Sequence, residues 1–240
     1  FTPLVQLDSA LNPRPWLAES WELTDSTVVL RLRDDVRWHD GELLTSEDVC
    51  FTWRFVTSAG SQVYNRDQYL GIVGCDTPDE HTVVFTWEGE RAYYAGLFEA
   101  ILPEHILGDM TTEQVVNHTP YNRGEALVGT GPFRFAEWRS GEYIRVVRND
   151  DYWRGPEYPA IDEIVWSFVP DSNTRLNALK AGRHDFGQIE PTQVAEVRDL
   201  DGYEVHLVSQ NTFMHFDLSL NDERATVLFS DQAVRRALFH

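Results

Sequence analysis

Pairs of short runs in which apolar and polar residues alternate occur along the chain, and each pair surrounds a turn. One pair lies within residues 21–33 around Thr24-Asp25-Ser26, and another lies within residues 72–87 around Thr77-Pro78-Asp79-Glu80. Alternation with a period of two is typical of half-buried strands, and Asp, Ser and Pro are typical of turns. The pattern therefore predicts two β-hairpins in the first part of the chain.

Elsewhere apolar residues recur at helical spacing. The clearest run follows Thr45, continues from Val49 to Val56 and ends before Gly60, and Asp48 stands where a capping box places an acceptor. We expect a helix there. Further helices are expected at about 92–100, 112–117, 172–181, 191–197 and 234–240, and further strands at about 161–169, 203–208 and 213–218. Hairpins and helices in this mixture predict an α/β fold with mixed α+β character.

The triplet Gly129-Thr130-Gly131 raises the question of a phosphate-binding loop. Such a loop needs a helix directly after it, because the free N–H groups at the start of the helix hold the anion. Here residues 133–138 alternate as a strand, residues 139–142 have the composition of a turn, and residues 143–147 alternate again. We therefore do not expect a nucleotide site at this triplet.

The formal net charge of −19 argues against nucleic acid as a partner, because its phosphates would be repelled. We interpret the excess of acidic residues as a solvated, acidic surface, and attraction of cationic ligands is the alternative. No stretch has the length of apolar residues that a membrane span requires.

Cys50 and Cys75 are the two cysteines of the chain, and they lack the CxxC spacing of zinc and redox sites. One disulfide in an exported protein and two buried free thiols are both compatible with this spacing. The residues alone leave both alternatives open.

Familiar catalytic motifs are missing from the sequence, which has no GxSxG, no HExxH and no P-loop. The neighbouring pairs His39-Asp40 and His184-Asp185 carry metal-ligating side chains, but we interpret them as turn residues that bond to nearby backbone. Most tryptophans lie in strand or helix patterns, so we interpret them as core residues rather than stacking platforms. They are Trp16, Trp21, Trp38, Trp53, Trp138, Trp153 and Trp166. We expect a protein that is not an enzyme.

Several longer stretches resemble, in order and spacing, the family 5 extracellular solute-binding proteins, which are the peptide-, nickel- and sugar-binding receptors of ABC importers. They are "LRLRDDVRWHDGELLTSEDVCFTW" (30–53), "VGTGPFRFAEW" (128–138), "RNDDYWRG" (148–155) and "VPDSNTRLNALKAGRHDFG" (169–187). Shorter stretches fit the same template, namely "PWLAESWE" (15–22), "LPEHIL" (102–107) and "DQAVRRAL" (231–238). The resemblance covers nearly the whole chain.

The resemblance implies a type II periplasmic-binding-protein-like fold, in which two lobes joined by a hinge enclose a ligand. Residues 1–125 would form an inserted smaller α+β domain of lobe 1, and residues 126–220 part of the split α/β domain of lobe 1. Residues 221–240 would begin lobe 2. We therefore expect the second lobe to be largely absent and the chain to be a fragment of a longer protein.

The same resemblance places cleft-facing positions in two short segments of the inserted domain. They are Tyr64, Asn65, Tyr69, Ala100, Ile101 and Glu104. Some relatives carry a basic residue where Glu104 stands, so an acid here favours a cationic or neutral ligand. A solvated acid at the start of a helix is the alternative interpretation of Glu104. No metal site and no cofactor is implied.

The implied function is that of the extracytoplasmic substrate-binding component of an ABC importer, for oligopeptides or dipeptides. Its partners would be a small-molecule solute and an ABC permease in the membrane. Its location would be the periplasm or the outside of the cell, with a lipid anchor to the cell surface as one arrangement of the full-length protein. Two alternatives stay open: a carboxylate-dependent carbohydrate hydrolase, and a non-transport sensor domain of the same fold.

Overall fold

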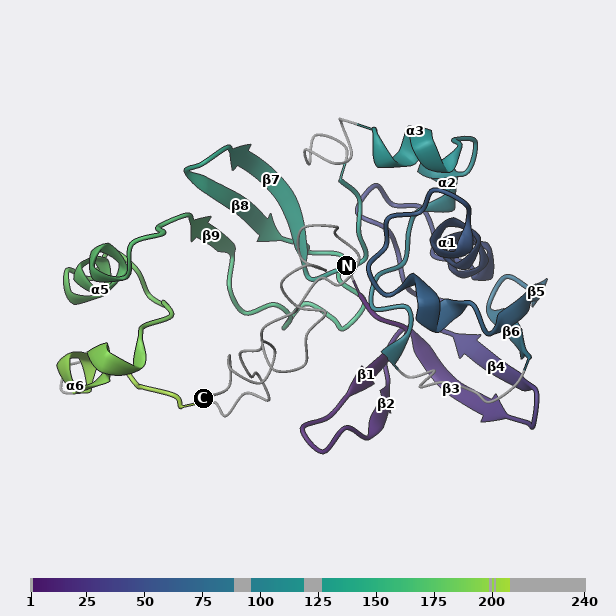
Figure 1. Cartoon of the computed structure of the whole chain (residues 1–240), viewed down its shortest axis with the longest axis horizontal. Helices are drawn as coiled ribbons and strands as arrows, with labels where there is room; N and C mark the ends of the chain where they lie inside the picture. Colours follow the sequence, from purple (N-terminus) through teal and green to yellow (C-terminus); the bar gives the residue numbers. More distant parts are fainter. Residues whose placement is uncertain (1, 89–95, 119–126, 199, 201, 208–240) are drawn as a thin grey trace, which may run out of the picture. The chain divides into compact units, whose positions relative to one another are not determined.

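The computed structural model describes residues 2–88, 96–118, 127–198, 200 and 202–207. The chain divides into two compact units, Phe1–Val169 and Pro170–His240, which are described separately below. Figure 1 shows the order of their elements along the chain. The expected domain boundaries near residues 125 and 220 stay predictions.

The first unit contains a four-stranded antiparallel sheet built from the two predicted hairpins. Its strands are β3 (Ala18–Leu23), β4 (Thr27–Leu32), β5 (Ile72–Asp79) and β6 (Thr82–Trp87), in the spatial order β3-β4-β6-β5. Both hairpins are confirmed, but the turn of the second was predicted too early, because β5 continues to Asp79. A register shift between Asp76 and Asp79 accommodates Pro78, which has no N–H for the ladder.

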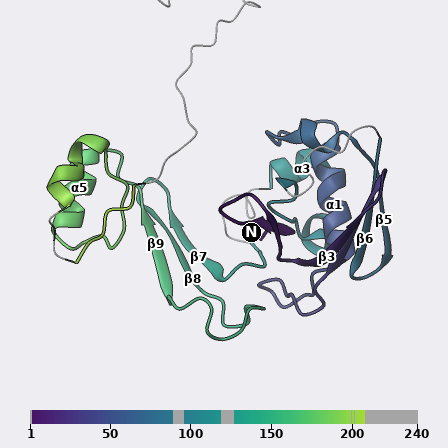
Figure 2. The ribbon, with the colours of Figure 1, turned by 90° about the horizontal axis from the view of Figure 1, so that it is seen from below.

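Helix α1 (Ser46–Thr57) packs against this sheet, as Figure 2 shows from below. The predicted capping box is confirmed: the Thr45 N–H donates to Asp48 Oδ2 at 2.8 Å. Buried Val49 of α1 joins Val28 and Phe85 of the sheet in one core. Cys50 and Cys75 form a disulfide between α1 and β5, with their Cα atoms 5.8 Å apart.

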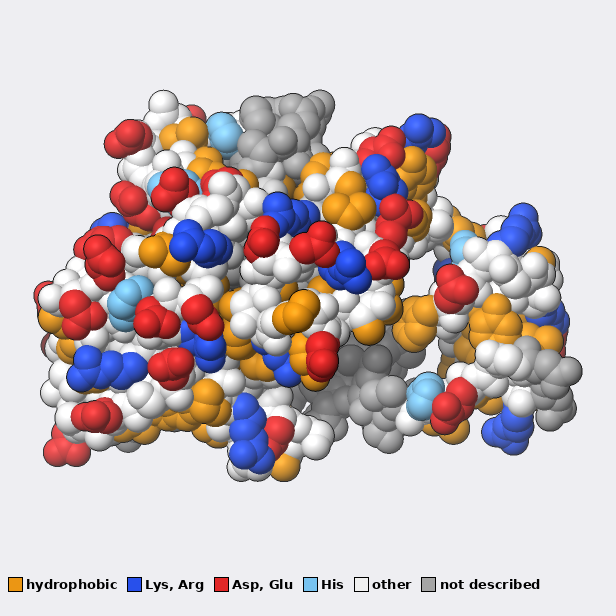
Figure 3. Space-filling view, turned by 180° about the vertical axis from the view of Figure 1, so that it is seen from behind, with side chains coloured by type: hydrophobic (Ala, Val, Ile, Leu, Met, Phe, Trp, Pro, Cys, Tyr) orange, Lys and Arg blue, Asp and Glu red, His pale blue; other side chains and the backbone are white. Residues whose placement is uncertain are grey.

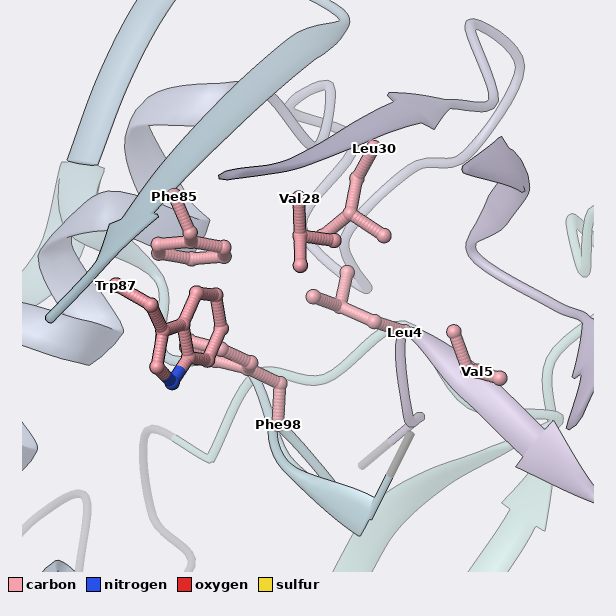
Figure 4. Close-up of a pocket in the computed structure, with 7 residues that line it drawn as sticks. All are labelled: Leu4, Val5, Val28, Leu30, Phe85, Trp87 and Phe98. Atoms are coloured by element: carbon pink, nitrogen blue, oxygen red, sulfur yellow. The ribbon is translucent and has the colours of Figure 1, made fainter. Parts of the chain in front are cut away.

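A small apolar cavity lies within this core. Figure 4 shows side chains from β1, β4, β6 and the segment around Phe98 pointing toward one another around it. The lining residues are Leu4, Val5, Val28, Leu30, Phe85, Trp87 and Phe98. Each of them is at most 5% exposed, so the cavity belongs to the packing of the core.

Shorter elements surround the sheet and helix. They are β1 (Val5–Leu7), which pairs with β2 (Pro13–Pro15), the 3-10 helix η1 (Arg66–Tyr69), and helices α2 (Glu104–Leu107) and α3 (Thr112–Val116). The helix predicted at 112–117 is confirmed. The helix predicted at about 92–100 is wrong for residues 97–100, where Phe98 has a φ of 57° and leaves the helical region. Residues 92–95 lie outside the described residues.

A second sheet follows the Gly129-Thr130-Gly131 triplet. Its strands are β7 (Phe133–Arg139), β8 (Tyr143–Arg148) and β9 (Glu163–Ser167), all antiparallel, and β8 lies in the middle. The predicted hairpin at 133–147 is confirmed, and Gly141 supplies the positive φ of 79° that its turn requires. The strand predicted at about 161–169 is shorter than expected.

The second unit contains helix α5 (Ser172–Lys180), the 3-10 helix η3 (Pro191–Gln193) and helix α6 (Val194–Val197). Asp171 caps α5 by accepting the Thr174 N–H at 2.7 Å, and Gly182 follows α5 with a φ of 63°. The strand predicted at about 203–208 is wrong for residues 203–207, where the Tyr203 side chain instead bonds to carbonyls of the unit. The strand at 213–218 and the helix at 234–240 lie outside the described residues.

The interpretation of the tryptophans as core residues is confirmed only in part. Trp38 is buried, and four others pack half-buried against the first core: Trp16, Trp21, Trp53 and Trp153. Trp138 and Trp166 are 42% and 52% exposed, so the interpretation is wrong for these two. Their alternating pattern correctly predicted strands, but it carries no information about what covers a strand.

Candidate functional site

Hydrogen bonds attach the two segments expected to face a ligand to each other and to helix α1. The Tyr69 hydroxyl accepts the Phe98 N–H at 2.8 Å, and their rings meet edge to face at 5.1 Å. Thr52 Oγ1 on α1 accepts the Leu102 N–H at 2.8 Å. Together these bonds hold the chain from Phe98 to Leu102 in one position.

Asp48 completes this attachment from the first turn of α1. Its Oδ1 accepts the Glu104 N–H at 2.8 Å, and its Oδ2 accepts from the Thr45 N–H at 2.8 Å and the Trp38 indole at 3.3 Å. Burial raises the pKa of the Asp48 carboxyl above its usual value, and these hydrogen bonds oppose the rise. One buried carboxylate therefore caps α1 and fixes the start of α2.

The six expected ligand residues differ widely in where their side chains lie. Tyr64 is 98% exposed, whereas Tyr69 and Ile101 are buried at 4% and 1%. Burial also raises the pKa of the Tyr69 hydroxyl. Asn65 and Ala100 are half-buried. The geometry gives Tyr69 and Ile101 a role in the core and leaves Tyr64 free to touch another molecule.

Glu104 is half-buried and begins α2. Its carboxylate lies over Gly108, where a side chain would collide with it. The alternative interpretation, an acid at the start of a helix, describes this placement. Contact of Glu104 or of the other five residues with a ligand stays a prediction.

His39, which lies between β4 and α1, is hydrogen-bonded to the Gly129-Thr130-Gly131 triplet. The Gly129 N–H donates to His39 Nδ1 at 3.2 Å, and His39 Nε2 lies 3.0 Å from the Gly131 carbonyl. Because Nδ1 accepts, the proton is assigned to Nε2, which donates to Gly131. The His39 N–H also donates to the Gly129 carbonyl at 2.9 Å. Burial lowers the pKa of His39, which favours this neutral ring.

Arg134 and Asn149 complete the attachment from the second sheet. Arg134 Nε donates to Asn149 Oδ1 at 2.8 Å, and another Arg134 nitrogen donates to the His39 carbonyl at 3.2 Å. Asn149 is 2% exposed, and its amide donates to the Gly131 carbonyl at 3.2 Å. We call His39, the triplet, Arg134 and Asn149 the clasp. The backbone groups of Gly129 and Gly131 are thus bound by side chains of the clasp, and the strand β7 rather than a helix follows the triplet.

Sequence reasoning missed the clasp. The expectation for His39-Asp40 was bonding to nearby backbone, but His39 bonds to backbone some ninety residues away along the chain. Asp40 accepts the Glu42 N–H at 3.3 Å, as expected for a turn, and also contacts His105 Nε2 at 2.9 Å. Within the described ranges, no group of three or more His, Cys, Asp or Glu side chains could hold a metal ion.

Acidic and basic side chains are interspersed over the face seen in Figure 3, and apolar side chains lie between them. Many of the arginines are paired, for example Arg33 with Asp35 at 2.7 Å and Arg134 with Asp151 at 2.7 Å. Among the described helices, none has the length and apolar character needed to cross a membrane.

Comparison with known proteins gives one consistent result. Residues 12–240 match the model of the bacterial extracellular solute-binding proteins, family 5 Middle. The chain is 28% identical over 240 residues to the oligopeptide-binding protein AppA of Bacillus subtilis, covering 98% of the chain and 43% of AppA. It is 31% identical over 187 residues to the nickel-binding periplasmic protein of Escherichia coli, covering 77% of the chain and 35% of that protein.

Solved structures agree with the sequence comparison. The structure of AppA in complex with a nonapeptide has a TM-score of 0.78 at 29% identity, over 84% of this chain and 40% of AppA. The structure of AgaA from A. tumefaciens R10 in complex with agropinic acid has a TM-score of 0.72 at 30% identity, over 83% of this chain and 40% of AgaA. The chain therefore spans less than half the length of the relatives it matches.

Proposed function

The chain belongs to the bacterial extracellular solute-binding proteins of family 5, and we propose that it is part of the extracytoplasmic substrate-binding component of an ABC importer for oligopeptides or dipeptides. The observation that carries the proposal is the match of residues 12–240 to the family, together with the likeness in fold to a nonapeptide-binding relative. The family consists of transport receptors rather than enzymes, so we propose no catalytic role.

We place one wall of the ligand cleft at the segments Tyr64–Tyr69 and Ala100–Glu104. What supports this is that both segments are bonded to α1: the Leu102 and Glu104 N–H groups donate to Thr52 and Asp48, and Arg66 donates to the Thr57 carbonyl at 2.9 Å. A wall that is already in position loses little conformational entropy on binding. Exposed Tyr64 is the side chain best placed to contact a solute, since Tyr69 and Ile101 are buried in the core and the Tyr69 hydroxyl already accepts the Phe98 N–H.

The peptide class is the part of the proposal most open to test, because the similar proteins include a nickel-binding protein and a structure with agropinic acid bound. The full-length gene product would be mixed in turn with dialanine, trialanine, a nonapeptide, maltose and a nickel–histidine complex, and its thermal unfolding followed. A peptide at a hundred times its Kd should stabilise the protein by about 2.7 kcal/mol. Stabilisation by maltose or nickel–histidine alone would replace the peptide class, and release of sugar from a glycoside would favour the hydrolase.

Tyr64→Ala tests the wall itself. Because Tyr64 is 98% exposed, its removal should leave the melting temperature of the ligand-free protein unchanged and weaken binding of the active peptide. Phe186→Ala is the matched control, since Phe186 is 90% exposed in the second unit. Equal affinity of the Tyr64 variant and the parent, measured by calorimetry, would remove Tyr64 from the site.

A further inference from the structure

The Cys50–Cys75 disulfide encloses the first of the two segments that we place at the ligand cleft. It joins α1 to β5, with the two Cα atoms 5.8 Å apart, and its loop has a sequence separation of 25. The segment Tyr64–Tyr69 lies in the connection between these two elements. The position of this segment therefore depends on how firmly α1 and β5 are held together.

The regular structure within this segment is η1, which is one turn of 3-10 helix. A 3-10 turn has poorer hydrogen-bond geometry than an α-helix, so it holds its own position weakly. Arg66 of η1 donates to the Thr57 carbonyl at the end of α1 at 2.9 Å. The Tyr69 hydroxyl accepts the Phe98 N–H at 2.8 Å. A shift of α1 against β5 would therefore move the first segment.

The second segment is attached to α1 on either side of the bridge. Two residues before Cys50, Asp48 accepts the Glu104 N–H at 2.8 Å. Two residues after Cys50, Thr52 accepts the Leu102 N–H at 2.8 Å. Cys50 itself is 1% exposed. The part of α1 that carries the bridge thus also carries the attachment of the second segment.

Strand β5 needs the bridge more than the other strands of its sheet do. Among the described strands it stands at the edge, with β6 as its neighbour, and its register shifts between Ile72 and Gly74 and again between Asp76 and Asp79. Edge strands with few ladder bonds open locally more readily than central ones. Cys75 lies between the two shifts, so the bridge ties the regularly paired part of β5 to α1.

We infer that the Cys50–Cys75 disulfide is a positioning element of the solute site, which keeps α1 and β5 at one spacing and thereby holds both segments of the wall in place. The inference rests on the function proposed above. A wall that must first be ordered loses conformational entropy when a solute binds, and this loss weakens binding. Removal of the bridge should therefore weaken solute binding in addition to lowering stability.

Hydrogen exchange in the full-length gene product tests the positioning without any solute. The variant is Cys50→Ala with Cys75→Ala. The reporters are the three backbone amides that donate to the side chains described above, those of Phe98, Leu102 and Glu104. Leu32→Ala is the matched control, since Leu32 is a core residue of β4 at 4% exposure and lies outside the disulfide loop.

Both variants lose stability, because the control leaves a cavity in the same core, so exchange through global unfolding rises in both. The reporters should nevertheless exchange roughly tenfold faster in the double variant than in Leu32→Ala, because only the double variant allows the wall to open locally. Equal exchange of the reporters in the two variants would overturn the inference, since the bridge would then stabilise the fold without positioning the wall.

Calorimetry of the same full-length proteins with trialanine measures the consequence for binding. The double variant should bind trialanine roughly tenfold more weakly than the parent, whereas Leu32→Ala should bind it as the parent does. Equal affinity of the double variant and the parent would also overturn the inference. If the parent does not bind trialanine, that result counts against the peptide class proposed above, and the exchange of the three reporters still decides whether the disulfide positions the wall.

Discussion

The two sheets of the first unit are both antiparallel and both built from hairpins that the sequence predicts, yet they differ in what covers them. The sheet β3-β4-β6-β5 has helix α1 on one face, a disulfide to that helix, and buried residues such as Val83 and Phe85 at 0% and 1% exposure. The sheet β7-β8-β9 has no buried side chain. The first sheet therefore carries a buried core that the second sheet lacks.

This difference shows that alternation of apolar and polar residues identifies the apolar face of a strand but does not identify the element that packs on that face. In the first sheet, the helix that covers the face lies in the same segment of chain, between β4 and β5, so nearby sequence contains both layers. The second sheet has only turns and loops between its strands. The clasp joins the two sheets, and a second contact reinforces it: Trp16 and Trp153 meet edge to face at 5.4 Å.

The largest expected effect comes from removing an aromatic ring from each sheet. Phe85→Ala should lower the free energy of unfolding by about 3 to 5 kcal/mol, because it leaves a cavity in a closed core. Phe135→Ala, its matched control in the half-exposed sheet, should cost less than about 1.5 kcal/mol. Urea unfolding followed by fluorescence measures both. Equal losses would mean that the two sheets are equally well packed and would break the comparison.

The disulfide should contribute the next largest effect, and only to the first sheet. Cys50→Ala with Cys75→Ala should lower the free energy of unfolding by about 3 kcal/mol, because the bridge closes a loop with a sequence separation of 25. Reductant should destabilise the parent by a similar amount and leave the double variant unchanged. Finding two reactive thiols per chain in denaturant without reductant would show that the bridge does not form.

Much of the local structure could be predicted from the sequence, because local residues determine it. Thr45 with Asp48 identified the start of α1, Asp171 identified the start of α5, and Gly141 identified a hairpin turn. The turn of the second hairpin was misplaced because Pro78 and Asp79 are typical turn residues that here belong to a strand with an irregular register.

The candidate site was less predictable, because long-range contacts determine it. Nothing in the spacing of Tyr69 and Phe98 indicates that the hydroxyl of one accepts the N–H of the other, or that Tyr69 is therefore committed to the core. The clasp has the same character, since His39 and Gly131 are distant in sequence and meet only in the fold. The family resemblance predicted the fold correctly and predicted a location for the cleft, but it could not distinguish exposed Tyr64 from buried Ile101.

The smallest expected effect concerns the clasp between the two sheets, and it depends on pH. Burial lowers the pKa of His39 below its ordinary value of about 6.5, so the unfolded chain binds this proton more readily than the folded protein. The contribution of His39 to stability is therefore complete above about pH 6.5 and is lost as the pH falls through the lowered value. Protonation would also replace the acceptor for the Gly129 N–H with a second donor.

The variant His39→Gln cannot titrate. It should cost about 1 kcal/mol of unfolding free energy at pH 7.5 through lost hydrogen bonds, and it should lose less additional stability between pH 7 and 5 than the parent does. Asp48, whose raised pKa gives the opposite slope, is present in both proteins, so the difference between their unfolding curves isolates His39. Identical pH profiles would show that His39 does not hold the two sheets together through its neutral ring.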